Sequence, residues 1–182
     1  LGIPVFFSEP RRLADIPSNL ERLGILTGTE SIANQAARSF RQELAELRAS
    51  YAGRAPVKVF YEIWPRPLMT INGQHLISQI ITLCGGINIF QDLPSLAPAV
   101  NFEAVLQKNP DVIISASSAA PQADWYRKWL HWPQLNAVKN RQFYYIEPDT
   151  IQRQTPRITA GARQLCRHLN NTRQSLPAIT PP

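Results

Sequence analysis

The chain has 182 residues, of which 44% are hydrophobic and 18% charged, and this is ordinary for one globular domain, or for one domain and part of another. No apolar run is long enough to cross a bilayer. The net charge of +6 comes from scattered Lys and Arg residues without interleaved aromatic residues, so nucleic acid is not an expected partner.

The apolar start, LGIPVFF at residues 1–7, has the character of a buried parallel strand. The connector after it contains one short helix, which Ser18 or Asn19 should cap and which should end near Gly24. A buried strand needs neighbours, and the sequence offers none before it. We therefore expect the neighbours of this strand to lie upstream of residue 1.

Residues 29–53 predict one long amphipathic helix. Its apolar residues recur three or four positions apart and form one stripe: Ile32, Ala36, Phe40, Leu44, Leu47 and Tyr51. Thr29 stands at the N-cap position, and Gly53 supplies a stop that tolerates a left-handed backbone. At about 1.5 Å per residue the helix should be roughly 33 Å long. It is either an ordinary helix packed on a sheet or a strut between two lobes.

Strands and helices alternate in the rest of the chain. Strands are predicted at residues 57–64, 88–90, 111–116 and 143–148, and helices at residues 74–84, 101–109, 123–130 and 156–169. This order is typical of the α/β class, with a parallel, Rossmann-like sheet covered on both faces. Residues 171–182 have no apolar periodicity, and we expect them to be a flexible tail.

Ligands of such sheets bind where the strands end. The loops at those ends are residues 64–70, 117–121 and 148–153. Trp64 and Met69 frame an apolar surface in the first loop, although Trp64 could equally cap the core. Asp149 and Arg153 are four residues apart, and they form either a weak exposed pair or an acid and a base that meet a polar ligand. Glu103 lies in the first turn of a helix, where a carboxylate stabilises the helix dipole.

The sequence offers little for catalysis or metal binding. Ser117 and Ser118 lack a G-x-S-x-G nucleophile elbow. The three histidines stand singly, without the spacing of metal ligands: His75, His131 and His168. We therefore expect no catalytic residue, no metal site and no enzyme activity.

Cys84 and Cys166 lie in separate apolar helical stretches. Spacing alone leaves open a disulfide or two buried thiols, because there is no C-x-x-C motif and no Cys/His cluster. A bridge would close a loop of about eighty residues and restrict the unfolded chain by about 4 kcal/mol.

Several stretches together resemble the periplasmic binding proteins that serve type II ABC importers of cobalamin, haem and ferric siderophores. They include VFYEIWPRPLMTINGQHLISQIITLCGGINIF, VNFEAVLQKNPDVIIS and DTIQRQTPRITAGARQLC, and the resemblance runs in order over residues 1–169. Within the family, the chain is most similar to the cobalamin-binding members. The resemblance implies half of a two-lobed, helix-linked protein. Residues 1–28 would be the last strand and the connector of an otherwise missing N-terminal lobe, residues 29–53 the bridging helix and residues 54–170 the C-terminal ligand-binding lobe.

The resemblance also implies roles for single residues. Four of them would form one wall of the cobalamin cleft: Trp64, Met69, Asp149 and Arg153. Glu103 would dock into arginine residues of the ABC permease in the inner membrane. Cys84 and Cys166 fall where the cobalamin binders have a disulfide, which implies an oxidising, periplasmic compartment and a signal peptide in the full-length precursor.

The chain also departs from the cobalamin binders. Met69 stands where they have an aromatic residue, Ala97 where they have tryptophan and Trp64 where they have glycine. The alternative ligands are therefore haem or a ferric siderophore, and an α/β hydrolytic enzyme is the alternative from another class. We expect no cofactor apart from the ligand, cobalamin or a related metal chelate. We also expect self-association that hides the apolar surface meant for the missing N-terminal lobe.

Overall fold

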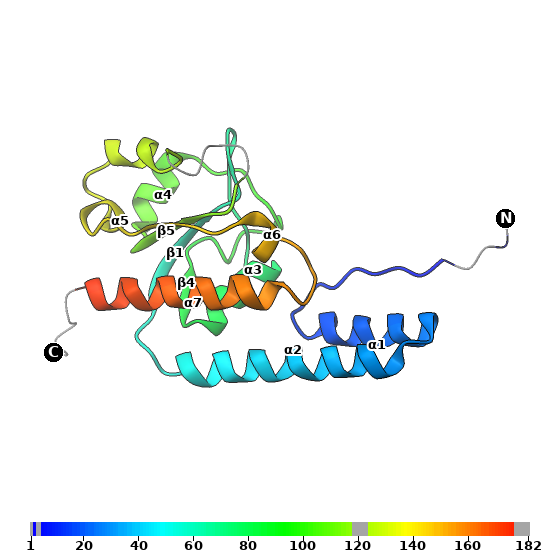
Figure 1. Cartoon of the computed structure of the whole chain (residues 1–182). Helices are drawn as coiled ribbons and strands as arrows, with labels where there is room; N and C mark the ends of the chain where they lie inside the picture. Colours follow the sequence, from blue (N-terminus) through cyan, green and yellow to red (C-terminus); the bar gives the residue numbers. More distant parts are fainter. Residues whose placement is uncertain (1, 3–4, 118–123, 177–182) are drawn as a thin grey trace.

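The computed structural model describes residues 2, 5–117 and 124–176. Four parallel strands form its central sheet, in the order β4-β1-β5-β6 (Figure 1). They are β1 (Val57–Glu62), β4 (Gly86–Asn88), β5 (Val112–Ser115) and β6 (Phe143–Tyr145). Val59 of β1 pairs with Asn88 on one side and with Val112 on the other. The α/β lobe predicted from the alternation of strands and helices is confirmed.

Helices cover both faces of the sheet (Figure 1). One face carries α3 (Leu76–Leu83) and α7 (Ile158–Ser175), and the other carries α4 (Phe102–Lys108), the 3-10 helix η1 (Arg127–His131) and α5 (Asn136–Lys139). Successive side chains of a strand point to opposite faces, so β1 sends Val59 and Tyr61 to the first core and Phe60 to the second. Two covered faces explain why the strand sequences are almost continuously apolar. No helix in the described ranges is both long and apolar enough to span a membrane.

The connections leave β1 in two directions. The chain passes through α3 to β4 at one side of β1 and then crosses to β5 at the other side. Such a reversal is a topological switch point, and ligands of open parallel sheets bind at the carboxyl ends of the strands there. At this end β1 is followed by a hairpin of β2 (Trp64–Pro65) and β3 (Leu68–Met69). The prediction of one strand over residues 57–64 is therefore wrong beyond Glu62, because Trp64 pairs within the hairpin.

The predicted long helix is confirmed as α2 (Glu30–Tyr51), whose 22 residues make it about 33 Å long. It lies beside α1 (Asp15–Thr27) (Figure 1). The two helices approach closely at Gly24, where any side chain would overlap that of Ala33. Phe40 and Leu47 of α2 are buried in the core with α3 and α7, whereas Ile32 near its start is exposed. The C-terminal half of α2 packs on the lobe, and its N-terminal half extends beyond it.

The limits of α1 differ from the prediction. It begins at Asp15, whose carboxylate accepts hydrogen bonds from two backbone N–H groups just before the helix, rather than at a cap formed by Ser18 or Asn19. It ends at Gly28, which has a φ of 67°, rather than at Gly24. A left-handed backbone is cheap for glycine, so Gly28 is the stop.

The predicted strand at residues 1–7 is wrong for the residues described. Residues 5–10 belong to no strand, and Phe7 is 83% exposed. The physical reason is that no strand of the described chain lies beside this segment to supply ladder hydrogen bonds.

The flexible tail predicted from residue 171 is wrong as far as residue 175, because α7 continues to Ser175. Polar anchors hold this last stretch. The Thr172 hydroxyl donates to the side-chain oxygen of Gln142 at 3.0 Å, and the Arg173 guanidinium donates to three backbone carbonyls. Residues 177–182 lie outside the described residues.

Two further segments differ from the prediction. The strand expected at residues 88–90 runs from Gly86 to Asn88 instead, because these residues pair with Val57 to Val59 of β1. Gly86 also packs closely against Ile81 and Leu169, where a side chain would overlap both. The helix expected at residues 123–130 is, in its described part, a turn followed by η1. Trp125 and Trp129 of this segment are both buried, so the packing of their rings in the core determines its backbone conformation.

Candidate ligand-binding site

The β2–β3 hairpin holds Trp64 and Met69 opposite each other at the carboxyl edge of the sheet. The Trp64 indole N–H donates to the carbonyl of Arg66 at 3.0 Å, which fixes the ring over the turn. The ring does not cap the core, because Trp64 is 43% exposed. Below it, the Thr70 hydroxyl donates to the carbonyl of Tyr61 at 2.8 Å and ties the hairpin to β1. The hairpin thus presents an aromatic ring, with a half-buried thioether opposite it.

The proline-rich loop at residues 91–100 is bound to the same hairpin. The Thr70 N–H donates to the carbonyl of Pro98 at 3.0 Å, and the Val100 N–H donates to the carbonyl of Leu68 at 2.9 Å. These bonds keep Ala97 and the exposed Leu96 next to the hairpin. The hairpin and the loop therefore form one surface.

Asp149 and Arg153 come together on the loop that follows β6. Pro148 opens the short helix α6 (Pro148–Ile151), and Asp149 lies in its first turn. The Arg153 Nε and Nη2 atoms lie 3.0 and 2.9 Å from the Asp149 Oδ1 atom, and both side chains are exposed. The exposed pair predicted from spacing is present, and its remaining polar atoms face solvent.

A hollow of about 590 Å³ lies between this edge and the N-terminal connector. Its lining includes polar side chains of the lobe and of the connector: Gln74, His75 and Gln154 from the first, Arg11 and Arg12 from the second. The Gln79 side chain holds the connector in place, because it accepts from the N–H of Leu13 and donates to the carbonyl of Arg11, both at 3.1 Å. Polar groups therefore continue from the carboxyl edge towards the connector.

Glu103 lies in the first turn of α4 and is exposed. Asn101 caps this helix, since its side-chain oxygen accepts from the N–H of Ala104 at 2.8 Å. Within the described residues, the Glu103 carboxylate has no ion-pair partner. It is available for a contact with another molecule.

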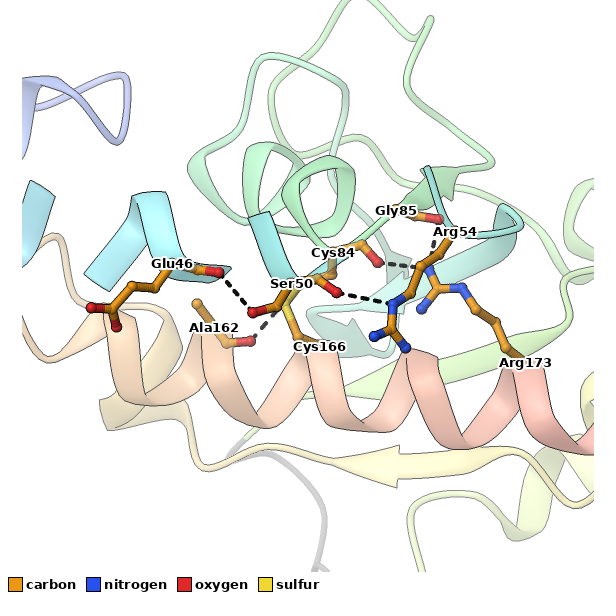
Figure 2. The surroundings of a disulfide bond; sticks show 8 residues. All are labelled: Glu46, Ser50, Arg54, Cys84, Gly85, Ala162, Cys166 and Arg173. Atoms are coloured by element: carbon orange, nitrogen blue, oxygen red, sulfur yellow. Dashed lines mark hydrogen bonds between the residues drawn. A yellow bond between two sulfur atoms is a disulfide. The ribbon is translucent and has the colours of Figure 1, made fainter. Parts of the chain in front are cut away.

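Cys84 and Cys166 form a disulfide with an S–S distance of 1.97 Å, and both are buried (Figure 2). The bond joins the end of α3 to α7. Arg173 reinforces the same junction, because its Nη2 atom donates to the carbonyls of Cys84 and Gly85 at 2.6 and 2.9 Å (Figure 2). The disulfide implied by the resemblance is confirmed, and it stabilises the helices that support the site.

One buried group at this edge was missed by the sequence reasoning. Glu62 is the last residue of β1 and is 1% exposed. Its Oε1 atom lies 2.6 Å from the Lys128 Nζ atom, and its Oε2 atom accepts from the Trp129 indole N–H at 3.2 Å. Burial raises the pKa of Glu62, although Lys128 and Trp129 oppose the rise. A carboxylate at the end of an apolar central strand was the available signal.

In the ranges described, no three His, Cys, Asp or Glu side chains gather as a metal-binding group. Ser117 is buried, and Ser118 lies outside the described residues, as does most of the loop at residues 117–121 that was expected at the ligand edge.

A parallel sheet with exposed loops at its carboxyl edge and a long helix at its side defines one lobe of a helix-linked binding protein. The chain belongs to the periplasmic binding protein family, whose sequence pattern matches residues 1–150. This confirms the resemblance, and the family gives a periplasmic location.

Individual relatives agree with this assignment. The chain is 34% identical to the vitamin B12-binding protein of Vibrio cholerae over 169 residues, which are 93% of the chain and 60% of that protein. Its fold is similar to the crystal structure of periplasmic vitamin B12-binding protein BtuF of Vibrio cholerae, with a TM-score of 0.84 and 31% identity over 95% of this chain and 67% of that one. The periplasmic heme-binding protein RhuT from Roseiflexus shares the fold alone, with a TM-score of 0.79 and 16% identity over 90% of this chain and 65% of that one. The chain thus spans about 60% of the length of the curated relative. These relatives are named as binding proteins, so the hydrolytic alternative gains no support.

Proposed function

We propose that the chain is the bridging helix and C-terminal lobe of a two-lobed periplasmic binding protein that holds cobalamin between its lobes and delivers it to an ABC permease. The observation that carries the proposal is the exposed Trp64 ring on the same ligand-binding edge as the exposed Asp149–Arg153 pair. Relatives named as vitamin B12-binding proteins support this ligand.

The side chains suit the chemistry of a corrinoid. Its macrocycle is flat and largely apolar, and its periphery carries neutral amide groups. An aromatic ring and a polarisable thioether cover such a surface well, as Trp64 and Met69 would. Asp149 would accept hydrogen bonds from amide N–H groups, and Arg153 would donate to amide carbonyls. The chain would act by binding and release, without making or breaking covalent bonds.

The second lobe would cover the other side of the ligand. Several apolar side chains of the N-terminal segment and of the α1–α2 end are exposed, as a surface for that lobe requires: Val5, Phe7, Ile25, Leu26 and Ile32. Without it, we expect weak binding, because half of the ligand would stay in water. We also expect this chain to self-associate through the exposed side chains. Light scattering that finds only monomers would contradict that expectation.

Glu103 would contact the permease. An exposed carboxylate without an ion-pair partner in the described residues suits a guanidinium group, because carboxylates and guanidinium groups pair in a bidentate geometry. In the two-lobed protein, Glu103→Gln should therefore reduce uptake while the affinity for the ligand stays the same. A loss of ligand affinity would contradict the role in docking.

Haem or a ferric siderophore is the second candidate ligand. The observation in its favour is that Met69 and Ala97 replace aromatic residues expected in a cobalamin binder, which leaves less aromatic surface at this edge. The polar Asp149–Arg153 pair would then meet the polar groups of the chelate.

Calorimetric titration of the two-lobed protein tests both candidates. Cyanocobalamin should bind more tightly than hemin or a ferric siderophore, and Trp64→Ala should weaken its binding roughly tenfold. Ile87→Ala is the matched control, because it also removes an exposed apolar side chain, which lies on β4 away from the hairpin. Tighter binding of hemin would favour the second candidate, and no effect of Trp64→Ala would remove the main support of the first.

A further inference from the structure

Glu62, Lys128 and Trp129 form a polar cluster, in which Glu62 and Trp129 are buried, at the topological switch point. Glu62 ends β1, the strand from which the connections leave in two directions. Lys128 and Trp129 belong to η1, on the sheet face opposite α3 and α7. The contacts to Glu62 therefore bring the ammonium group of Lys128 to the carboxyl end of β1, where ligands of such sheets bind.

The two charges differ in their exposure. Glu62 is 1% exposed, and both of its oxygen atoms have partners on η1. The Lys128 side chain is 26% exposed, and its Nζ atom lies 5.7 Å from the centre of the Trp129 ring. The carboxylate is thus enclosed, while the ammonium group lies between it and the surface.

Stability alone is a weak reason for such a pair. A buried ion pair is seldom more stabilising than apolar side chains of the same shape, although removal of one partner is strongly destabilising. The rings around the pair would form an apolar core without it, since Phe60 already packs edge to face against both Phe90 and Trp129. The pair is better explained by the position that it gives to Lys128.

Lys128 keeps hydrogen-bonding capacity after it has paired with Glu62. Its ammonium group has three N–H donors, and Glu62 is the acceptor that the described residues supply. Its positive charge is offset by a carboxylate 2.6 Å away. A donor of this kind suits a neutral oxygen acceptor, whereas a carboxylate ligand would meet little net attraction.

We infer that Lys128 is a specificity-determining contact that donates to a neutral carbonyl oxygen of the bound chelate, and that Glu62 is the positioning residue that cancels its charge. This inference rests on the proposed function. Amide groups at the periphery of a corrinoid are acceptors of this kind, whereas haem carries carboxylates. The cluster therefore selects for amide-bearing chelates over carboxylate-bearing ones.

Monocarboxylate derivatives of cyanocobalamin, each with one peripheral amide hydrolysed, test the inference in the two-lobed protein. The unaltered protein should bind at least one derivative about fivefold more weakly than cyanocobalamin. Glu62→Gln leaves the Lys128 charge uncompensated and should remove most of that difference. Lys128→Met should weaken binding of cyanocobalamin itself and abolish the discrimination. Glu62→Gln combined with Lys128→Met buries no charge, so it keeps the test valid if Lys128→Met alone does not fold.

Lys139→Met is the control, because it removes a lysine on α5, away from Glu62. It should change neither the affinity for cyanocobalamin nor that for its monocarboxylate derivatives. If the variants at Glu62 and Lys128 change all affinities by one common factor, or change none, the inference is overturned and the cluster is structural. If the unaltered protein binds no corrinoid, the proposed function itself is overturned. Binding with the predicted change in discrimination supports both.

Discussion

The two faces of the central sheet are covered by different chemistry. On one face, α3 and α7 bury aliphatic side chains and are joined by the Cys84–Cys166 disulfide. On the other face, short helices bury aromatic rings, and the rings of Phe60 and Phe102 lie 5.4 and 5.0 Å from that of Trp129. The one ion pair in the described residues with an enclosed carboxylate, Glu62 with Lys128, lies on this second face.

This difference suggests two roles: the first face stabilises the lobe, and the second face carries the proposed ligand specificity. The 18-residue helix α7, joined to α3 by a covalent bond, gives the first face a stability that depends little on the site. Short helices of four to seven residues on the second face have few backbone bonds of their own, so side-chain contacts fix their positions. Two of those contacts, from Lys128 and Trp129 of η1, are made to Glu62 at the carboxyl edge of the sheet. Stability should therefore respond most to changes on the first face, and discrimination between ligands to changes on the second.

Reduction of the disulfide should have the largest effect on stability. Cys84 and Cys166 are 82 residues apart, and the loss of so long a loop constraint should lower the free energy of unfolding by about 4 kcal/mol. Urea denaturation with and without reductant measures the change. In the control, Cys84→Ala combined with Cys166→Ala, reductant should have no effect. A loss below about 1 kcal/mol would show that the first face does not depend on this bond.

His168 should make the first face sensitive to acid. Its ring stacks on Tyr144 at 4.1 Å, and its Nε2 atom is buried without a hydrogen-bond partner among the described residues. Burial together with Arg167 lowers its pKa to about 4. The unfolded chain takes up this proton near the usual pKa of about 6.5, so this contribution is complete above that pH and is lost as pH falls towards 4. The free energy of unfolding should fall by up to about 3 kcal/mol over this range.

His168→Phe isolates this effect, because it keeps an aromatic ring against Tyr144 and cannot titrate. Burial also lowers the pKa of His75, but that contribution is common to both proteins and cancels in the difference. The free energy of unfolding of the unaltered protein should fall relative to that of the variant as the pH falls from 7 to 4. Urea denaturation at several pH values measures both free energies of unfolding. A constant difference between the unaltered protein and His168→Phe from pH 7 to 4 would contradict the prediction.

Trp129→Phe should have a smaller effect on stability, on the second face. It removes the indole N–H that donates to Glu62 and leaves a buried carboxylate oxygen without this partner, which should cost about 2 kcal/mol. Trp125→Phe is the matched control, because Trp125 is buried on the same face and packs edge-on against Phe143. In combination with Glu62→Gln the cost should shrink. If both tryptophan variants lose the same free energy of unfolding, the effect is due to the smaller ring and not to the lost hydrogen bond.

The regular parts of the first face could be predicted from the sequence. The apolar stripe of α2 and the run of apolar residues in α3 follow from local periodicity. The extension of α7 to Ser175 could not, because Thr172 and Arg173 are held by polar contacts with distant segments. The disulfide followed only from the resemblance to a known family, since spacing left free thiols open.

Less of the second face and of the site could be predicted. Trp64, Met69, Asp149 and Arg153 were selected because their loops follow strands, and the resemblance gave them roles. Glu62 and Lys128 are 66 residues apart, and their contact depends on how η1 packs on the sheet. The local periodicity of the sequence does not predict that packing. The carboxylate at the end of an apolar strand was visible, but its partner was not.

Asp149→Asn should have the smallest effect on stability, although it alters the proposed binding site. The Asp149–Arg153 pair is exposed on both sides, so its loss should change the free energy of unfolding by less than about 0.5 kcal/mol. In the two-lobed protein the same change should weaken binding of cyanocobalamin, because an amide replaces a charged acceptor at the ligand edge. Asp124→Asn breaks another exposed pair, with Arg127, and should leave both quantities unchanged. An unfolding loss above about 1 kcal/mol for Asp149→Asn would mean that the pair supports α6 rather than the ligand, because exposed ion pairs seldom contribute that much.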